Sequence, residues 1–178
     1  MARKTKTYVL MLSQAFPAKH PRVGEPTFFS TKLKKALKMP IESPALPFNE
    51  PIRKIHTIRA NYDLWKKRFD KIDKGEAELS IRVWEGKPYK SKQIELARLD
   101  RSHGIGIQKA IIGITNDKWK MPELKFVDEN DNSVVHSITW GGLIAQKDGL
   151  NIEDWRNWFK TYDRSKPMAI IHFTPFRY

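Results

Sequence analysis

Lys54-Ile55-His56-Thr57-Ile58-Arg59 is a short basic segment whose β-branched residues favour a β-strand. It carries two side chains that can react with each other or with a substrate, Lys54 and Thr57. In a regular strand, residues three apart point to opposite faces. For these two side chains to act together, Lys54 must therefore lie just before the strand or at a bulge. The rest of the chain is expected to form the scaffold and the pocket around this segment.

The chain has the length and composition of one domain. Its 178 residues fit the roughly 100 to 200 residues of a typical domain, so residues 1–178 are predicted to form a single unit. Hydrophobic residues make up 40% of the chain, which is enough for a core and argues against general disorder. The absence of cysteine excludes disulfides, thiolate metal sites and cysteine nucleophiles, and favours an intracellular, cytoplasmic protein. No apolar run approaches the roughly 18 residues of a membrane span, so no membrane partner is predicted.

The charge of the chain is strongly positive and unevenly distributed. The formal net charge is +13, and the first 70 residues contain 15 basic and 5 acidic residues, which places +10 of this charge there. A positive field attracts polyanions, of which nucleic acid is the commonest in a cell. Solvated lysines on helix faces are the alternative explanation of the same pattern. The charge therefore predicts RNA or a nucleoside as the partner and leaves the oligomeric state open.

Helical periodicity appears in three stretches. Residues 26–38 place Phe29 and Leu33 on one face and four lysines, Lys32, Lys34, Lys35 and Lys38, on the other. A second helix is predicted after Asn61 and a third after Asn151, because Asn is a favourable N-cap in front of an apolar stripe. Residues 39–52 contain four prolines without hydrophobic periodicity and are predicted to form an irregular loop, either a flexible insertion or a pocket lid.

Strand patterns occupy most of the remaining chain. Residues 77–84 alternate apolar and polar side chains, and with residues 93–99 they predict a hairpin. A second hairpin is predicted around the polar turn at residues 128–132. The dipeptide Gly141-Gly142 is expected to interrupt the regular secondary structure after it. About six or seven strands and three helices, without a repeating βαβ unit, predict an α+β fold whose strands curl into a small β-barrel or a strongly bent sheet.

Familiar cofactor and metal motifs are missing. Gly104-Ile105-Gly106 lacks the third glycine and the following helix of a dinucleotide-binding loop. The five histidines lack the spacing of metal ligands, and the acidic turn near residue 130 lacks the spaced ligands of a calcium loop. The sequence therefore predicts neither a cofactor nor a metal, and the histidines are interpreted as surface or packing residues.

Thr27-Phe28-Phe29, a short helix and the Lys-x-x-Thr-x-Arg pattern of residues 54–59 together resemble the ASCH domains of the PUA-like superfamily. The pattern is most similar to the small bacterial N(4)-acetylcytidine amidohydrolases of that group. The resemblance implies a PUA-like, ASCH-type β-barrel with about three flanking helices. It also implies a catalytic set of Lys54, Thr57 and an acid from a loop before a later helix, which corresponds to Asp148. This chain has Asp where the family has Glu, and it is longer, with a Pro-rich loop before Lys54.

The residue chemistry is compatible with that set. A lysine next to Arg53 and near Arg59 that is also partly buried has a lowered pKa and can activate Thr57 or a water. Asp148 would orient the lysine, and Arg59 would hold a carbonyl oxygen or the edge of a pyrimidine. Arg53 is a further candidate for binding the substrate. Three aromatic residues near turns are candidates for stacking on a base, namely Trp84, Tyr89 and Trp140.

Three functions remain open from the sequence. The first is binding of a nucleobase, nucleoside or RNA in a basic cleft, with hydrolysis of an amide on a modified cytosine such as N(4)-acetylcytidine. The second is a non-catalytic RNA-binding module or a reader of modified bases. The third is a ribonuclease, which would need chemistry directed at phosphate.

Overall fold

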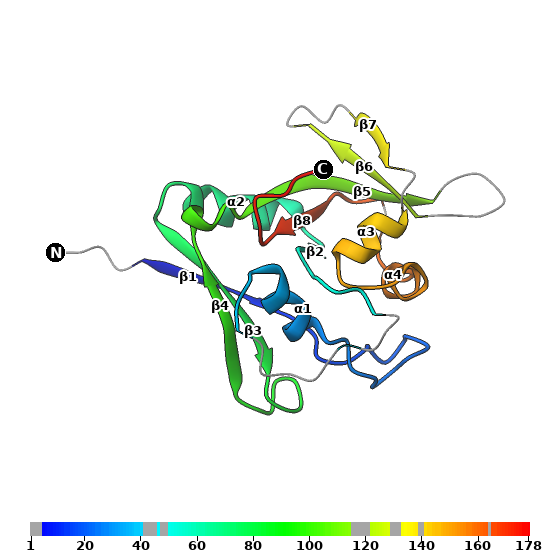
Figure 1. Ribbon diagram of the computed structural model, residues 1–178. Helices are drawn as coiled ribbons and strands as arrows, with labels where there is room; N and C mark the ends of the chain where they lie inside the picture. The colour runs from blue at the N-terminus through cyan, green and yellow to red at the C-terminus, as the bar shows by residue number, and fades with distance from the viewer. Residues whose placement is uncertain are drawn as a thin grey trace.

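The computed structural model describes residues 5–40, 46, 50–114, 122–128, 133–138, 141–163 and 165–178. Within these ranges the chain forms an α+β fold with four α-helices, one 3₁₀ helix and eight strands arranged in two sheets (Figure 1). The α+β class predicted from the sequence is therefore confirmed. No helix in the described part of the chain is both long and apolar enough to cross a membrane.

The first sheet has three strands in the order β1-β3-β4. Strand β1 (Lys6–Met11) runs parallel to β3 (Ala77–Trp84), and β3 pairs antiparallel with β4 (Gln93–Leu99). The predicted hairpin is confirmed with the expected bounds. The parallel pair arises because the chain passes through α1 (Phe29–Ala36), β2 (His56–Arg59) and α2 (Tyr62–Asp73) before it returns as β3.

The second sheet has five antiparallel strands in the order β2-β8-β5-β6-β7. Its strands are β2 (His56–Arg59), β5 (Gly106–Ile114), β6 (Pro122–Val127), β7 (Ser133–Ile138) and β8 (Met168–His172). All five residues of β8 are buried, and this strand pairs with both β2 and β5. Strands β6 and β7 form the predicted second hairpin, whereas residues 129–132 of its turn lie outside the described residues.

The closed β-barrel predicted from the sequence is wrong, because the strands form two open sheets. In the described residues no ladder joins an edge of one sheet to an edge of the other. The chain leaves β4 through the 3₁₀ helix Arg101–His103, which Asp100 caps, and Gly104 then turns the backbone at φ 68° into β5. Strands β4 and β5 therefore follow each other without pairing. Strand alternation reveals which residues face a core, but it does not reveal which edges pair.

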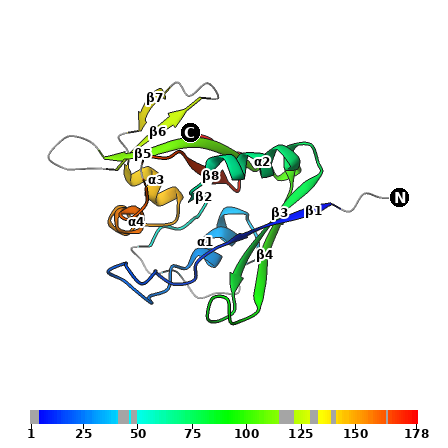
Figure 2. The ribbon, with the colours of Figure 1, turned by 180° about the vertical axis from the view of Figure 1, so that it is seen from behind.

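The start predicted from the sequence is correct for helix α2 but not for helix α1. Helix α1 (Phe29–Ala36) begins later than Pro26, which instead forms a β-bridge with Ala15. Helix α2 (Tyr62–Asp73) begins where expected, because the Asn61 side chain accepts a hydrogen bond from the backbone N–H of Leu64 at 3.2 Å. The helix contacts strands of both sheets (Figure 2), and its buried residues are Trp65, Phe69 and Ile72.

Helices α3 (Gly141–Lys147) and α4 (Ile152–Phe159) lie next to each other and complete the four helices, one more than the three predicted. Strand β7 ends before the Gly141-Gly142 dipeptide, as predicted, and the two glycines form the first residues of α3. The Asn151 side chain caps α4 by accepting from the N–H of Asp154 at 2.8 Å, as predicted. Figure 1 shows the segment that leads into β2 passing between α1 and α3. This crossing positions the candidate site.

Candidate functional site

The start of the segment at residues 54–59 is held by backbone hydrogen bonds from three directions. The N–H of Lys54 donates to the carbonyl of Lys32 in α1 at 3.1 Å, and the N–H of Ile55 donates to the carbonyl of Lys147 in α3 at 2.9 Å. The N–H of Phe173, just after β8, donates to the carbonyl of Ile55 at 2.8 Å. Lys54 therefore lies two residues before β2 begins, which confirms the position required by its spacing from Thr57.

Lys54 and Asp148 form a buried ion pair, called the buried pair below. The Lys54 Nζ donates to Asp148 Oδ1 and to the Asp148 carbonyl, each at 2.5 Å. Lys54 is 1% exposed and Asp148 is 3% exposed. The Phe29 ring covers the ammonium, with Nζ 4.0 Å from the ring centroid. The structure thus brings together two of the three residues predicted to be catalytic, across 94 positions of sequence.

Burial moves both members of the buried pair toward their neutral forms. Desolvation lowers the pKa of Lys54 to about 8, although the Asp148 charge opposes this change and Arg59 and Lys32 add to it. Desolvation likewise raises the pKa of Asp148, against the attraction of Lys54. The indole N–H of Trp155 also interacts with the Asp148 carboxyl and lowers its pKa, although it lies outside hydrogen-bonding geometry. A proton transfer between the two groups is therefore less costly than it would be in water.

Asp148 lies in the turn between α3 and α4, and a second lysine holds this turn. The N–H of Asp148 donates to the carbonyl of Ile144 at 2.9 Å, and Gly149 follows at φ +82°. The Nζ of Lys32 donates to the Gly149 carbonyl at 2.7 Å and to Glu50 Oε2 at 2.6 Å. Lys32 is buried and was wrongly predicted to lie on the outer face of its helix.

His56 is next to the buried pair and was missed as a site residue. Its Nδ1 lies 3.9 Å from Asp148 Oδ1 and has no hydrogen-bond partner among the described residues, while its Nε2 is 2.7 Å from the Tyr178 hydroxyl. Burial lowers the pKa of His56 well below its ordinary value, so the ring is neutral. A carboxylate facing Nδ1 favours the tautomer with hydrogen on Nδ1, and the Tyr178 hydroxyl then donates to Nε2. Residues two apart in an extended segment point to the same side, so the spacing between Lys54 and His56 could have predicted that His56 lies near the site.

Thr57 and Arg59 are placed differently from the prediction. Thr57 is buried opposite Ile171 of β8, and no hydrogen bond links its hydroxyl to either member of the buried pair within the described ranges. The Arg59 guanidinium donates to the carbonyl of Met11 at the end of β1, so it joins the two sheets. Burial lowers its pKa, and its charge acts on both members of the buried pair.

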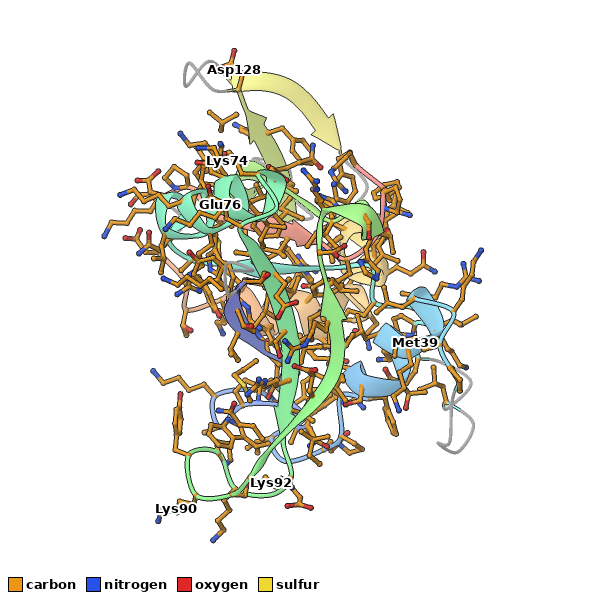
Figure 3. The ribbon with its side chains drawn as sticks, turned by 90° about the vertical axis from the view of Figure 1, so that its left-hand side faces the viewer. Met39, Lys74, Glu76, Lys90, Lys92 and Asp128 are labelled. Carbon is orange, nitrogen blue, oxygen red and sulfur yellow. The ribbon has the colours of Figure 1, made fainter. Side chains whose placement is uncertain are left out.

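The remaining predicted binding residues do not gather at the buried pair. Arg53 is exposed and lines a pocket with Lys147 and Phe176. Tyr89 is 90% exposed and packs on Trp84 with ring centroids 5.4 Å apart, on the β3–β4 hairpin. That hairpin ends far from α3 (Figure 1), and Figure 3 shows Lys90 and Lys92 at its tip. Trp140 lies outside the described residues, as do residues 41–45 and 47–49 of the Pro-rich loop.

Within the part of the chain that the structure describes, no group of His, Cys, Asp or Glu side chains has the arrangement of a metal site. No protein-family model matches the chain, and neither the curated proteins nor the solved structures contain a significant match.

Proposed function

We propose that this chain binds a nucleoside or RNA and hydrolyses an amide on a modified cytosine such as N(4)-acetylcytidine, as its resemblance to ASCH-domain amidohydrolases implies. The observation that carries the proposal is the buried pair of Lys54 and Asp148. With its pKa lowered to about 8, roughly a tenth of Lys54 is neutral at pH 7 and able to accept a proton. Groups whose pKa is shifted by burial and by a specific partner concentrate at functional sites.

In the proposed reaction, neutral Lys54 takes a proton from water while the water oxygen attacks the carbonyl carbon of the amide. The tetrahedral intermediate then breaks its C–N bond, and the Lys54 ammonium returns the proton to the N4 amine that leaves. One water is consumed, and acetate and cytidine are the products. Thr57 is the alternative nucleophile, in which case water hydrolyses the resulting acetyl ester. Asp148 holds the lysine and stabilises its charged form.

The class of ligand is supported by the distribution of charge. The first 70 residues contribute +10 of the net +13, and they include α1, β2 and the segment that carries Lys54. A field of this sign raises the local concentration of anionic ligands and of RNA.

A second candidate function is a non-catalytic reader of RNA or of a modified base. The observation that favours it is the complete burial of Lys54, whose ammonium is occupied by Asp148 and covered by Phe29. In a reader, the buried pair would fix the turn between α3 and α4 and would not take part in a reaction.

The deciding experiment incubates the purified protein with N(4)-acetylcytidine and measures cytidine by chromatography. Lys54→Met, Asp148→Asn and Thr57→Val are assayed in parallel, with Lys90→Met on the exposed hairpin as the matched lysine control. Each variant is first checked for cooperative unfolding. We expect wild type and Lys90→Met to release cytidine and the folded Lys54→Met variant to release none. The rate should rise with pH toward about 8, since neutral Lys54 is the active form.

Loss in Thr57→Val identifies the threonine as nucleophile, whereas retained activity favours direct attack by water. An absence of cytidine release by wild type at high enzyme concentration would overturn the hydrolase. The reader would then be tested by comparing the affinity for RNA with and without the acetyl group.

A further inference from the structure

The outer side of the segment before β2 forms a groove that the reaction above does not use. A pocket of about 490 Å³ lies between the end of α1, the end of α3 and the C-terminal tail, and Arg53, Ile55, Lys147 and Phe176 contribute to its walls. A second pocket of about 500 Å³ extends toward the start of α4. Ile52 and Gln146 line both pockets, so the two adjoin and form one elongated groove.

The two cations of the groove are the chain neighbours of the buried pair. Arg53 precedes Lys54 and Lys147 precedes Asp148, and the hydrogen bond from Ile55 N to the Lys147 carbonyl at 2.9 Å joins the two segments. Lys54 and Asp148 point into the protein, whereas Arg53 and Lys147 line the pocket outside. The same backbone crossing therefore creates a neutralised pair inside and two positive charges outside.

These outer charges are available to an anion. Neither Arg53 nor Lys147 forms an ion pair with another of the described residues, and the described lining of the first pocket includes no carboxylate. The Lys147 ammonium lies 4.0 Å from the centroid of the Phe176 ring, which holds it at the pocket wall. Glu50 lines the second pocket, but its carboxylate is already paired with Lys32 and Arg22.

The groove also offers apolar surface and the length for an extended ligand. Ile52 is 64% exposed, and it lies where the two pockets meet. Each pocket falls in the range of roughly 300 to 1,000 Å³ that holds small ligands. A nucleotide combines a flat base with an anionic phosphate, so the apolar side chain of Ile52 and the two cations of the groove offer one contact for each part.

We propose that this groove binds single-stranded RNA, with a phosphate held by Arg53 and Lys147 and a neighbouring base packed against Ile52. The arginine fork suits phosphate geometry, and the lysine adds a second point charge. The inference rests on the proposed function for the class of ligand. It adds a binding surface for the strand that is separate from the buried pair.

The test measures fluorescence anisotropy of a labelled hexacytidylate RNA over a range of salt concentrations. Arg53→Ala/Lys147→Ala is compared with Lys90→Ala/Lys92→Ala, which removes the same charge at the hairpin tip (Figure 3). We expect the groove variant to bind at least about ten-fold more weakly and to show a shallower salt dependence, by about one released counterion. The hairpin variant should bind within about two-fold of wild type. Ile52→Ser should weaken competition by cytidine 5′-monophosphate more than competition by inorganic phosphate.

Equal losses of RNA affinity in the two double variants would overturn the proposal, because they would show that binding depends on the overall positive charge and not on the groove. It would also fail if wild type did not bind the RNA, or if an oligoglutamate peptide displaced the RNA as well as an unlabelled RNA does. Hydrolysis of free N(4)-acetylcytidine involves no phosphate, so failure of that assay leaves this measurement intact. If the protein hydrolyses N(4)-acetylcytidine but does not bind the RNA, the groove proposal fails while the proposed hydrolase activity stands.

Discussion

At the scale of single residues, the pKa of Lys54 has a measurable consequence for stability. Its folded pKa of about 8 lies below the ordinary value of 10.5, so between these values the unfolded chain binds more protons than the folded chain. The free energy of unfolding is therefore expected to rise with pH through this interval, by up to about 3 kcal/mol. Urea titrations of wild type and Lys54→Met from pH 7.5 to about 10 check this.

The Lys54→Met variant supplies the baseline, because other lysines and tyrosines titrate equally in both proteins. The pH-dependent gain should appear in wild type and be absent from the variant. Parallel pH dependences in the two proteins would show that Lys54 titrates as an ordinary lysine in the folded state.

Gly149 provides a second prediction at a single residue. It adopts φ +82°, and a Cβ there would lie 3.1 Å from Lys54 Cβ and 3.4 Å from Lys32 Cδ. Gly149→Ala should lower the free energy of unfolding by about 1 to 2 kcal/mol from the backbone alone, with a further cost from crowding the two lysines. Gly24→Ala is the matched control, since Gly24 has φ +81° and nothing within 4 Å of its Cβ position.

Thermal or urea unfolding of both glycine variants separates the two costs. Gly24→Ala reports the backbone cost, and the extra loss in Gly149→Ala reports the crowding. If the two variants lose the same stability, the turn between α3 and α4 has room to move away from the buried lysines.

At the scale of elements, α1, the segment at Glu50 and the turn before α4 are joined by a buried lysine. Lys32 is fully buried between Glu50 Oε2 and the Gly149 carbonyl. Lys32→Met should therefore cost up to about 3 to 5 kcal/mol, because it removes the buried donor of both Glu50 and the Gly149 carbonyl, although Arg22 still pairs with Glu50. Lys35→Met on the same helix should cost less than about 1 kcal/mol. Lys32→Met combined with Glu50→Leu should recover much of the loss.

A double-mutant cycle by urea unfolding measures this coupling. Additive losses from Lys32→Met and Glu50→Leu would contradict it, because they would mean that the two side chains do not stabilise each other. Arg22 also pairs with Glu50, so Glu50→Leu alone is expected to destabilise as well.

The elements that the sequence predicted correctly depend on local signals. Helix α2 follows from its cap at Asn61 and the stripe through Phe69, and the β3–β4 hairpin follows from alternation of side chains. Lys32 shows the limit of such reasoning, since its spacing from Phe29 places it near the buried face and its charge argued for the solvent. Its partners lie 18 and 117 positions away, and no local pattern reveals them.

The candidate site was predictable to a similar extent. Lys54 and Asp148 were found through their resemblance to a family motif, and the position of Lys54 before β2 followed from strand geometry. Burial of the pair depends on packing against Phe29 of α1, and the contact of His56 with Tyr178 depends on the C-terminal residue lying next to β2. The β-barrel prediction was wrong for a related reason. Which edges of the two sheets pair is decided by the path of the chain between β4 and β5 and not by the strands themselves.

At the scale of the whole molecule, one hydrophobic core spans both open sheets. Helix α2 contacts β3 of the first sheet and β5 and β8 of the second, and the Arg59 guanidinium donates to the Met11 carbonyl at the end of β1. Neither sheet can lose its packing without exposing the buried stripe of α2. We therefore expect the chain to unfold as one cooperative unit, although its sheets are not closed into a barrel.

Phe69→Ala tests this expectation, because Phe69 is buried in the stripe that faces both sheets. The variant should lose about 3 to 5 kcal/mol in a single transition, with tryptophan fluorescence and far-UV circular dichroism still coinciding in urea. Leu64→Ala is the control on the same helix, since Leu64 is 43% exposed and should change stability by less than about 1 kcal/mol. Two separated transitions in the Phe69→Ala variant would show that each sheet holds its own core, and that α2 stabilises them independently.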